Sequence, residues 1–248
     1  MISPCITAFR MLTIVALPGK DSVPISRALY FFPLTGMLLG LVTYGLLQLA
    51  VDVSPQLQFV STILILILYT ILTGAFHLDG LADVADGFGG GKSREHIQSI
   101  LKDSRLGTFG TIALVSDILL KLSLWFVCLN IGVPVWIAIS IMYARIVQAL
   151  FVMSHNPAFD SGLLSQLLKI DATRAWLMLL VSAVFWGAGA LFSVPRSALV
   201  GGLVSLGLCF LFGRYCCRRI GGITGDCVGC ANEIAEISFL LTVCFIHS

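Results

Sequence analysis

Residues 57–93 read LQFVSTILILILYTILTGAFHLDGLADVADGFGGGKS, a long apolar run followed at once by a polar stretch. The apolar part, 57–76, carries no charged residue. A helix that crosses a bilayer needs about 20 predominantly apolar residues, so this part predicts a membrane span. The polar part, 77–93, gathers three aspartates, a glycine run and a Gly-Lys-Ser, and it is the first place to look for function.

The composition of the whole chain agrees with a membrane protein. Of its 248 residues, 58% are hydrophobic and only 11% are charged, with a mean hydropathy of +0.99. An average soluble domain has about 25% charged residues. The chain therefore lacks the polar residues that would cover a water-soluble surface. Its basic residues are scattered rather than gathered in one segment, so we expect no nucleic-acid partner.

Seven apolar segments are candidate spans, of which the last is short and marginal. We expect an all-α, polytopic integral membrane helical bundle with six or seven spans and cytoplasmic interfacial helices, forming a single domain over 1–248. A short N-terminal apolar segment either lies in the membrane interface or folds back into the bundle. The candidate spans are 32–51, 57–76, 108–130, 134–153, 175–194, 197–213 and 231–246.

Lysine and arginine predict how the bundle is oriented, because cytoplasmic loops are enriched in both. If the 77–107 loop is cytoplasmic, then 1–31, 154–174 and 214–230 are cytoplasmic too. These segments hold nearly all the basic residues, whereas the opposite side has only Arg196. The count predicts a cytoplasmic N-terminus and, with seven spans, an external C-terminus.

The acidic residues gather on the same predicted side, in two short windows. The first window is 79–103 and the second is 226–236. Ordinary solvating charge would be spread over all loops. We therefore expect one cytoplasmic-facing site built from two segments that are distant in sequence.

A phosphate-binding P-loop does not explain the first window. The pattern G-x-x-x-x-G-K-[ST] needs a glycine five residues before Gly91, where this chain has Asp86. A P-loop also follows a buried strand, whereas this stretch follows a membrane helix. We reject this interpretation.

A metal site explains the aspartates better. On a helix, Asp79, Asp83 and Asp86 fall within an arc of about 60°. Like charges on one face repel each other, and a divalent cation removes that conflict. Mg²⁺ is typically held by carboxylates together with substrate phosphates. Gly80 and Gly87 would leave room for a bulky ligand. The alternative, a merely solvated loop, does not require this helical phasing.

An amphipathic stretch follows, with the sequence SREHIQSILKD at 93–103. Asp103 at its end could complete the metal site, and Arg105 could bind a phosphate through its planar guanidinium, with Ser104 between them. The alternative is an interfacial helix that ends in ordinary charges. His77 is a weaker candidate, because a lone histidine at a helix end is often only an interface residue.

The second window lies in GGITGDCVGCANEIAE, residues 221–236. Its glycines, including Gly225, allow a turn whose backbone N–H groups face an anion. Asp226 either belongs to the site or caps the following helix. Glu233 and Glu236 share one helix face and enter an apolar run, where carboxylates are costly and usually functional.

Two further charged positions lie inside predicted spans. Asp117 and Lys121 are four residues apart and can neutralise each other, so an intramembrane pair is expected. Arg145 has no partner nearby in the sequence. It could reach the acidic site or an anionic ligand.

Three blocks together resemble the cobalamin synthase family: FHLDGLADVADG at 76–87, LKDSRLGTFG at 101–110 and GGITGDCVGCANEIAE at 221–236. The resemblance extends over nearly the whole chain. It implies a prokaryotic cytoplasmic (inner) membrane enzyme that transfers α-ribazole, or its 5′-phosphate, onto adenosylcobinamide-GDP with release of GMP. It implies Mg²⁺ as the cofactor. A homo-oligomer and association with other cobalamin-assembly enzymes are both compatible with it.

The resemblance also implies roles for individual residues. It implies a catalytic, metal-binding set: Asp79, Asp83, Asp86 and Asp103. It implies a substrate-binding set: His77, Gly80, Gly87, Ser104, Arg105, Arg145, Gly225, Asp226, Glu233 and Glu236.

Two other classes remain as alternatives. CDP-alcohol phosphatidyltransferases have a motif that begins D-x-x-D-G-x-x-A-R, but Gly90 and Gly91 stand here where Ala-Arg should be. A cation transporter would also use intramembrane carboxylates. That class tends to place them near the midplane, in broken helices of two related halves. This chain has no such repeat.

Overall fold

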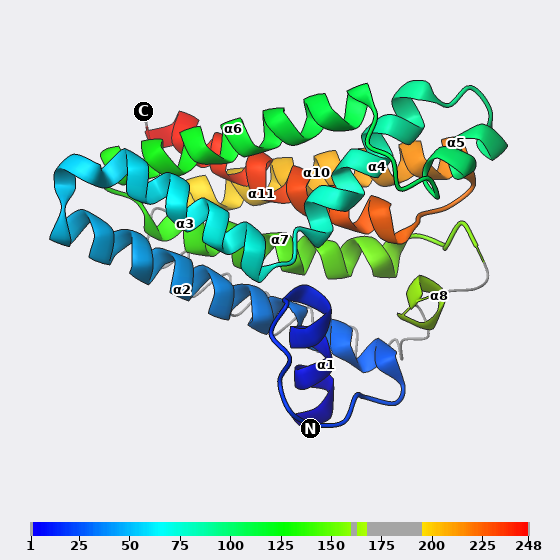
Figure 1. Ribbon diagram of the computed structural model, residues 1–248, viewed down its shortest axis with the longest axis horizontal. Helices are drawn as coiled ribbons and strands as arrows, with labels where there is room; N and C mark the ends of the chain where they lie inside the picture. The colour runs from blue at the N-terminus through cyan, green and yellow to red at the C-terminus, as the bar shows by residue number, and fades with distance from the viewer. Residues whose placement is uncertain (1, 160–162, 168–194, 248) are drawn as a thin grey trace.

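The computed structural model describes residues 2–159, 163–167 and 195–247 (Figure 1). Within these ranges the regular structure is helical, apart from one isolated bridge between Pro157 and Ile223. The elements are α1 (Ile2–Leu12), η1 (Ile25–Phe31), α2 (Phe32–Val53), η2 (Pro55–Leu57), α3 (Gln58–Leu72), α4 (Phe76–Gly90), α5 (Arg94–Ile100), α6 (Thr108–Asn130), α7 (Val135–Ser154), α8 (Leu163–Leu167), α10 (Pro195–Ile220) and α11 (Gly225–His247).

Six helical segments of the described chain are long and apolar enough to cross a membrane. They include α2, α3 with η2, α6, α7, α10 and α11, which confirms the all-α polytopic prediction. The expected span at 175–194 lies outside the described residues. The last segment was predicted to be marginal, and this was wrong: α11 has 23 residues and begins at Gly225, six residues before the predicted start.

The predicted span 57–76 also ends early. Helix α3 stops at Leu72, and the chain turns through Gly74 and Ala75, both of which have positive φ angles. Left-handed backbone breaks a right-handed helix, and it is uncommon for a residue with a Cβ such as Ala75. As a result, α4 is a separate helix that begins at Phe76 and carries the first acidic window.

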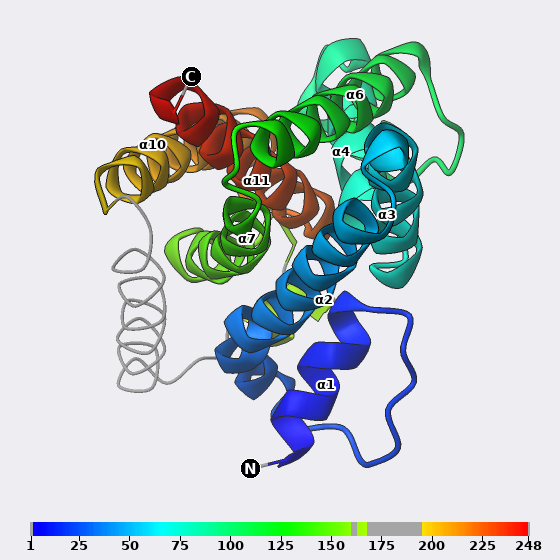
Figure 2. The ribbon, with the colours of Figure 1, turned by 90° about the vertical axis from the view of Figure 1, so that its left-hand side faces the viewer.

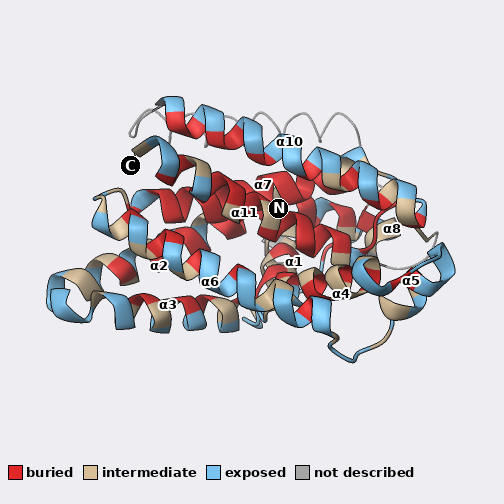
Figure 3. Cartoon of the chain, turned by 90° about the horizontal axis from the view of Figure 1, so that it is seen from above, coloured by how far each residue is buried: buried red, intermediate tan, exposed pale blue. Residues whose placement is uncertain are grey.

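The helices form a central pair and an outer layer. Helices α7 and α11 are largely buried, whereas α2, α3, α6 and α10 each expose apolar side chains (Figure 3). The outer faces include Leu41, Leu64, Ile112 and Leu203, which are all exposed. In a membrane protein such a surface meets lipid, so the buried polar groups of α7 and α11 are shielded from the bilayer by the outer helices.

The two ends of the bundle differ. Helices α5 and α8 and the α10–α11 turn lie at one end, and the α2–α3 turn lies at the other with the C-terminus (Figure 1). Helix α1 folds back beside the start of α2, with Ala8 and Leu12 buried (Figure 2). The structure thus shows α1 folded back against η1 and α2, as the second interpretation of the N-terminal segment expects, and its place relative to the membrane interface stays a prediction.

Candidate functional site

The site forms where the N-terminal part of α4 crosses the N-terminal part of α11. Glycines allow the close approach: a Cβ on Gly80 would lie 2.7 Å from the backbone oxygen of Asp226, and one on Gly229 would lie 3.2 Å from the Cα of His77. Small residues permit this kind of contact between membrane helices. The crossing places Asp226 beside the aspartates of α4, although about 150 residues separate them in sequence.

The idea that Gly80 and Gly87 leave room for a ligand was wrong. The space beside Gly80 is filled by the backbone of Asp226, and a Cβ on Gly87 would lie 3.1 Å from the side chain of Leu101. Both glycines serve helix packing. They reach the site indirectly, because Gly80 fixes the position of α11.

Four carboxylates form what we call the acidic face: Asp79, Asp83, Asp86 and Asp226. Asp79 is exposed, and the other three are partly buried. The pKa of Asp83 is raised to about 6, first by burial and then by the negative charges of Asp79, Asp226 and Asp86. The structure therefore confirms that the three α4 aspartates share one face. It also shows that their negative charges act on one another.

Asp86 has a second, structural task. It accepts hydrogen bonds from the backbone N–H groups of Gly107 (2.7 Å) and Gly110 (2.8 Å), at the start of α6. Helix N-termini leave such N–H groups without intrahelical partners, and a carboxylate there also favours the helix dipole. The glycines are needed because a Cβ at Gly107 would lie 2.5 Å from the Asp86 carboxylate.

The remaining residues predicted from the first window lie elsewhere. Asp103 and Arg105 form an exposed ion pair with each other at 2.6 Å, in the loop between α5 and α6, and Ser104 between them is exposed. This pairing lowers the pKa of Asp103. The P-loop remains excluded, because α4 continues to Gly90 and the Ser93 side chain caps α5 by accepting from the His96 N–H.

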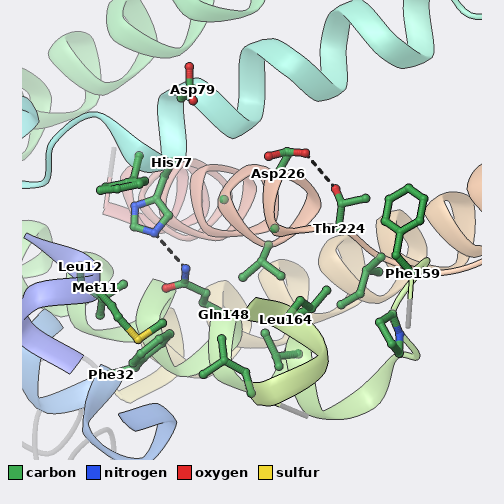
Figure 4. A pocket seen from close by; sticks show the side chains of 18 residues that line it. Met11, Leu12, Phe32, His77, Asp79, Gln148, Phe159, Leu164, Thr224 and Asp226 are labelled. Carbon is green, nitrogen blue, oxygen red and sulfur yellow. Dashed lines mark hydrogen bonds between the residues drawn. The ribbon is translucent and has the colours of Figure 1, made fainter. Parts of the chain in front are cut away.

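A cavity of about 600 Å³ opens beside the crossing of α4 and α11 (Figure 4). Its polar side chains are His77, Asp79, Gln148, Thr224 and Asp226, which come from α4, α7 and the start of α11. The rest of the wall is mainly apolar and is supplied by α1, α2, α4, α7, α8, α11 and the segments before α8 and α11. The apolar lining residues are Met11, Leu12, Phe32, Phe76, Val152, Pro157, Phe159, Leu164, Leu167, Ile223 and Val228.

His77 is buried in this wall, and its Nε2 lies 2.9 Å from the side-chain nitrogen of Gln148. Burial, and then the positive charges of Arg145 and Lys121, hold the pKa of His77 well below its usual range. The ring is therefore neutral, and it can accept or donate a hydrogen bond according to its tautomer.

The start of α11 forms another part of the wall. The Thr224 hydroxyl accepts from the Cys227 N–H at 3.3 Å and donates to Asp226 at 3.1 Å. A Cβ added to Gly225 would meet no heavy atom within 4 Å, so this first helical residue faces open space. Asp226 lies in the first turn, but Thr224 is the capping residue, which excludes the simple capping role considered for Asp226.

The other two carboxylates of the second window lie deeper. Glu233 and Glu236 are about 12 and 17 Å along α11 from Gly225, at 1.5 Å per residue. Both are buried and form ion pairs with Lys121 of α6, which also lies 3.7 Å from Asp117. The Tyr69 hydroxyl donates to Glu236 at 3.1 Å.

The expected Asp117–Lys121 pair is therefore confirmed as part of a larger cluster. We call Asp117, Lys121, Glu233 and Glu236 the buried cluster. None of its members lines the cavity. The roles of Glu233 and Glu236 in substrate binding remain predictions.

Arg145 of α7 lies next to this cluster and is completely buried. One of its terminal nitrogens donates to the side chain of Asn232, which in turn donates to Glu233 at 3.2 Å. Its Nε and Nη2 have no hydrogen-bond partner among the described residues. Arg145 thus contacts the second window through Asn232, and its binding of an anionic ligand stays a prediction.

The acidic face has the right chemistry for Mg²⁺, a hard cation that prefers oxygen ligands and usually completes its coordination with waters and substrate phosphates. No lysine or arginine of the described chain forms an ion pair with the four carboxylates, so a bound cation would relieve their mutual repulsion. In the described part of the chain, no three histidine, cysteine or acidic side chains are placed to hold a metal ion by themselves. The residues fit a metal whose site is completed by a phosphorylated substrate.

Sequence reasoning missed two residues of the cavity wall, Gln148 and Thr224. Gln148 lies within an apolar span, and a buried amide there is costly unless it has partners, which is the signal that could have identified it. Thr224 precedes the glycine that begins α11, so the N-cap pattern Thr-Gly-Asp could have indicated it.

Comparison with known proteins identifies the family of this chain. Residues 4–244 match the family described as cobalamin-5-phosphate synthase. Two proteins named adenosylcobinamide-GDP ribazoletransferase are similar to this chain: one from Prosthecochloris aestuarii is 36% identical, with 95% of each chain covered, and one from Ralstonia pickettii is 37% identical, with 94% of this chain and 90% of its own covered. No solved structure matches. The chain belongs to the cobalamin-5-phosphate synthase family.

Proposed function

We propose that this protein is an adenosylcobinamide-GDP ribazoletransferase that assembles the nucleotide loop of cobalamin. The observation that carries the proposal is the acidic face beside a largely apolar cavity, in a chain that matches the family over residues 4–244. The acidic face suits a phosphate-transfer reaction, and the cavity suits an organic substrate. Proteins with this printed name are similar to the chain over nearly its full length.

The reaction replaces the phosphoanhydride bond to GMP with a phosphate ester bond to the ribose of α-ribazole. A ribose hydroxyl of α-ribazole, or of its 5′-phosphate, attacks the phosphorus that is bonded to adenosylcobinamide. The bond from this phosphorus to the bridging oxygen of the diphosphate breaks, and GMP leaves with that oxygen. The hydroxyl proton passes to a base. Such transfers depend on positioning and charge stabilisation more than on covalent chemistry by the protein.

Asp226 is the best-placed base. It lines the cavity, lies in the first turn of α11 and is oriented by the Thr224 hydroxyl at 3.1 Å. A carboxylate within reach of the nucleophilic hydroxyl can accept its proton during the attack. The open space at Gly225 lets the hydroxyl and the phosphate approach the start of α11, whose N–H groups favour an anion.

Asp79 and Asp83 would hold Mg²⁺ together with the diphosphate of the substrate. When bound, this ion supplies charge neutralisation for the diphosphate and the departing GMP. Asp86 is already engaged by two N–H groups of α6, and Asp103 by Arg105. We therefore place the metal on the exposed end of the acidic face.

The site faces the cytoplasm in this proposal, and the protein lies in the inner membrane. This orientation is supported by the basic residues near the end of the bundle that holds α5 and the α10–α11 turn. They include Lys92, Arg94, Arg218 and Arg219. Segments rich in lysine and arginine stay on the cytoplasmic side. Nucleotide substrates are also cytoplasmic. Reporter fusions after Gly91 and Gly221 should read cytoplasmic, and one after Val53 should read external.

The test is direct. Purified protein in liposomes is incubated with adenosylcobinamide-GDP and α-ribazole, with and without Mg²⁺, and GMP and the corrinoid product are quantified. The proposal predicts equal amounts of GMP and cobalamin product, only when Mg²⁺ and both substrates are present. GMP release that does not require α-ribazole would identify a hydrolase instead and contradict the proposal.

A further inference from the structure

We infer that the cavity holds the aromatic base of α-ribazole, and that Gln148 recognises the free ring nitrogen of this base. The inference rests on the proposed function, and it assigns the cavity to one of the two substrates. It also orients that substrate, with the base toward Gln148 and the ribose toward Asp226.

The lining of the cavity favours the base over the other substrate. Dimethylbenzimidazole is a flat, apolar bicyclic ring without an N–H group once it is bonded to ribose. Adenosylcobinamide-GDP instead presents amide side chains, a diphosphate and a guanine, all of which need polar partners. Placing such groups against Leu12, Phe32 and Val152 would cost their hydrogen bonds to water. The apolar wall is therefore suited to the base.

The size of the cavity also favours α-ribazole as its ligand. Small-molecule sites typically measure about 300–1,000 Å³ and bury most of their ligand. The cavity of about 600 Å³ lies inside this range and accommodates a nucleoside. The corrin macrocycle with its side chains is much larger than a nucleoside. It has to remain outside, on the exposed side of the acidic face where Asp79 lies.

The polar groups lie at two separate places in the wall, as a nucleoside requires. His77 and Gln148 lie together at one place, and Thr224 and Asp226 lie together at another (Figure 4). Apolar side chains from α1 and α2, Met11, Leu12 and Phe32, lie near the first pair (Figure 4). A nucleoside bound across the cavity presents its base to the first pair and its ribose hydroxyls to the second. This orientation also brings the nucleophilic hydroxyl to the proposed base.

Gln148 has one side-chain atom, its Oε1, without a hydrogen-bond partner among the described residues. Gln148 is 4% exposed, and this oxygen is covered by protein atoms. A buried amide oxygen without a partner is costly, which indicates a ligand or a different amide orientation. Its nitrogen lies 2.9 Å from Nε2 of the neutral His77 ring.

One rearrangement satisfies every group when the base is bound. If the Nε2 of His77 carries the proton, it donates to Gln148 Oε1, and the amide NH₂ then takes the place of the oxygen. The exchange of oxygen and nitrogen in an amide leaves its shape unchanged. Protein atoms cover this position in the structure, so the Gln148 side chain must rotate toward the cavity when the base binds. The NH₂ group then donates to the free nitrogen of benzimidazole, which is an acceptor. His77 then acts as a positioning residue that orients Gln148.

The test measures the KM of each substrate separately. Gln148→Leu removes the amide and keeps the approximate volume, so the KM for α-ribazole should rise about tenfold, as expected for one lost hydrogen bond. The KM for adenosylcobinamide-GDP should stay unchanged. An α-ribazole analogue with dimethylindole as the base lacks the free nitrogen, so its KM should be the same for both proteins. Gln48→Leu on α2, which does not line the cavity, is the matched control.

A second variant tests the apolar wall and remains informative if Gln148→Leu does not fold. Val152→Thr introduces a hydroxyl into the wall at nearly constant volume, and Val42→Thr on the exposed face of α2 is its control. We expect a higher KM for α-ribazole with Val152→Thr only. A rise in the KM for adenosylcobinamide-GDP instead, or no change in either KM, would overturn the assignment. If the unaltered protein transfers no ribazole, the proposed function is refuted, and equilibrium dialysis with α-ribazole alone decides the assignment: weaker binding to Val152→Thr than to Val42→Thr supports it, and equal binding overturns it.

Discussion

The acidic face and the buried cluster contain the same kinds of carboxylate in opposite settings. Asp79, Asp83 and Asp86 lie along α4, near Asp226 in the first turn of α11, and no lysine or arginine forms an ion pair with them in the described chain. In the buried cluster, one ammonium group lies between three carboxylates inside the bundle. The acidic face therefore accumulates negative charge, whereas in the buried cluster the ammonium group of Lys121 neutralises part of the negative charge.

From this difference we expect the acidic face to bind ligands and the buried cluster to stabilise the fold. Like charges near one another are unfavourable unless something binds to them, so the acidic face is suited to a cation and a phosphorylated substrate. Buried charges are tolerated when they are paired, so the buried cluster holds α6 and α11 together. Of the second acidic window, only Asp226 lies with the acidic face, and we expect Glu233 and Glu236 to serve the fold rather than the reaction. Glu233 and Glu236 join a different structure.

The largest expected effect follows removal of the only cation of the buried cluster. Lys121→Met leaves Asp117, Glu233 and Glu236 buried without it, and breaking a buried pair typically costs about 3–5 kcal/mol. We expect a large drop in the free energy of unfolding, or loss of folded protein. The measurement is denaturant or thermal unfolding in detergent micelles.

The control for Lys121→Met is Lys102→Met, at an exposed position. It should unfold like the unaltered protein. Adding Glu233→Gln and Glu236→Gln to Lys121→Met should restore part of the stability, because it removes the uncompensated charges. If Lys121→Met were as stable as Lys102→Met, the buried cluster would not hold the bundle together.

A smaller loss of stability is expected for Asp86, the member of the acidic face with a structural task. Asp86→Ala removes the acceptor for the N–H groups of Gly107 and Gly110. Hydrogen bonds to charged groups contribute about 1.5–3 kcal/mol, and we expect a loss of this size. Asp103→Ala removes only an exposed pair with Arg105 and should leave the unfolding temperature unchanged. Equal stability of the two variants would show that Asp86 does not stabilise α6.

The smallest effect on stability is expected at the exposed end of the acidic face. Asp79→Asn relieves repulsion between two aspartates one helical turn apart, so it should stabilise the protein by a few tenths of a kcal/mol. The measurement is the unfolding temperature without Mg²⁺ and at low salt, because salt screens the repulsion. A clear destabilisation would mean that Asp79 makes a contact on which the fold depends.

Local patterns in the sequence predicted much of the fold. The span 108–130 was predicted with the bounds that α6 has, because the apolar run is bordered by a glycine and an asparagine. The start of α11 was missed because Gly225, Asp226 and Gly229 suggest a loop. Asp226 and Gly229 are helical and pack against α4 rather than against lipid, whereas Gly225 begins the helix and faces open space. The early end of α3 was missed because its apolar run continues through the turn at Gly74 and Ala75.

The site could be predicted only as far as one helix extends. The shared face of Asp79, Asp83 and Asp86 follows from helical geometry alone. The ion pair between Glu233 and Lys121 cannot be predicted in this way, because the two residues are 112 positions apart in sequence. Only the pair of Lys121 with Asp117, four residues apart, was visible beforehand. The contact between α4 and α11 depends on two glycines, and their role could be seen only once both helices were placed.

The central claim is that the acidic face performs chemistry and the buried cluster maintains the fold. The most direct test measures kcat for ribazole transfer and the unfolding temperature together, for Asp83→Asn and Glu233→Gln. We predict that Asp83→Asn lowers kcat by about 100-fold or more, as removal of one charge-stabilising group often does, with an unfolding temperature that does not fall. Glu233→Gln should lower the unfolding temperature and leave kcat of the folded protein within a few-fold. A strong loss of kcat for Glu233→Gln at unchanged stability, with Asp83→Asn still active, would contradict the account.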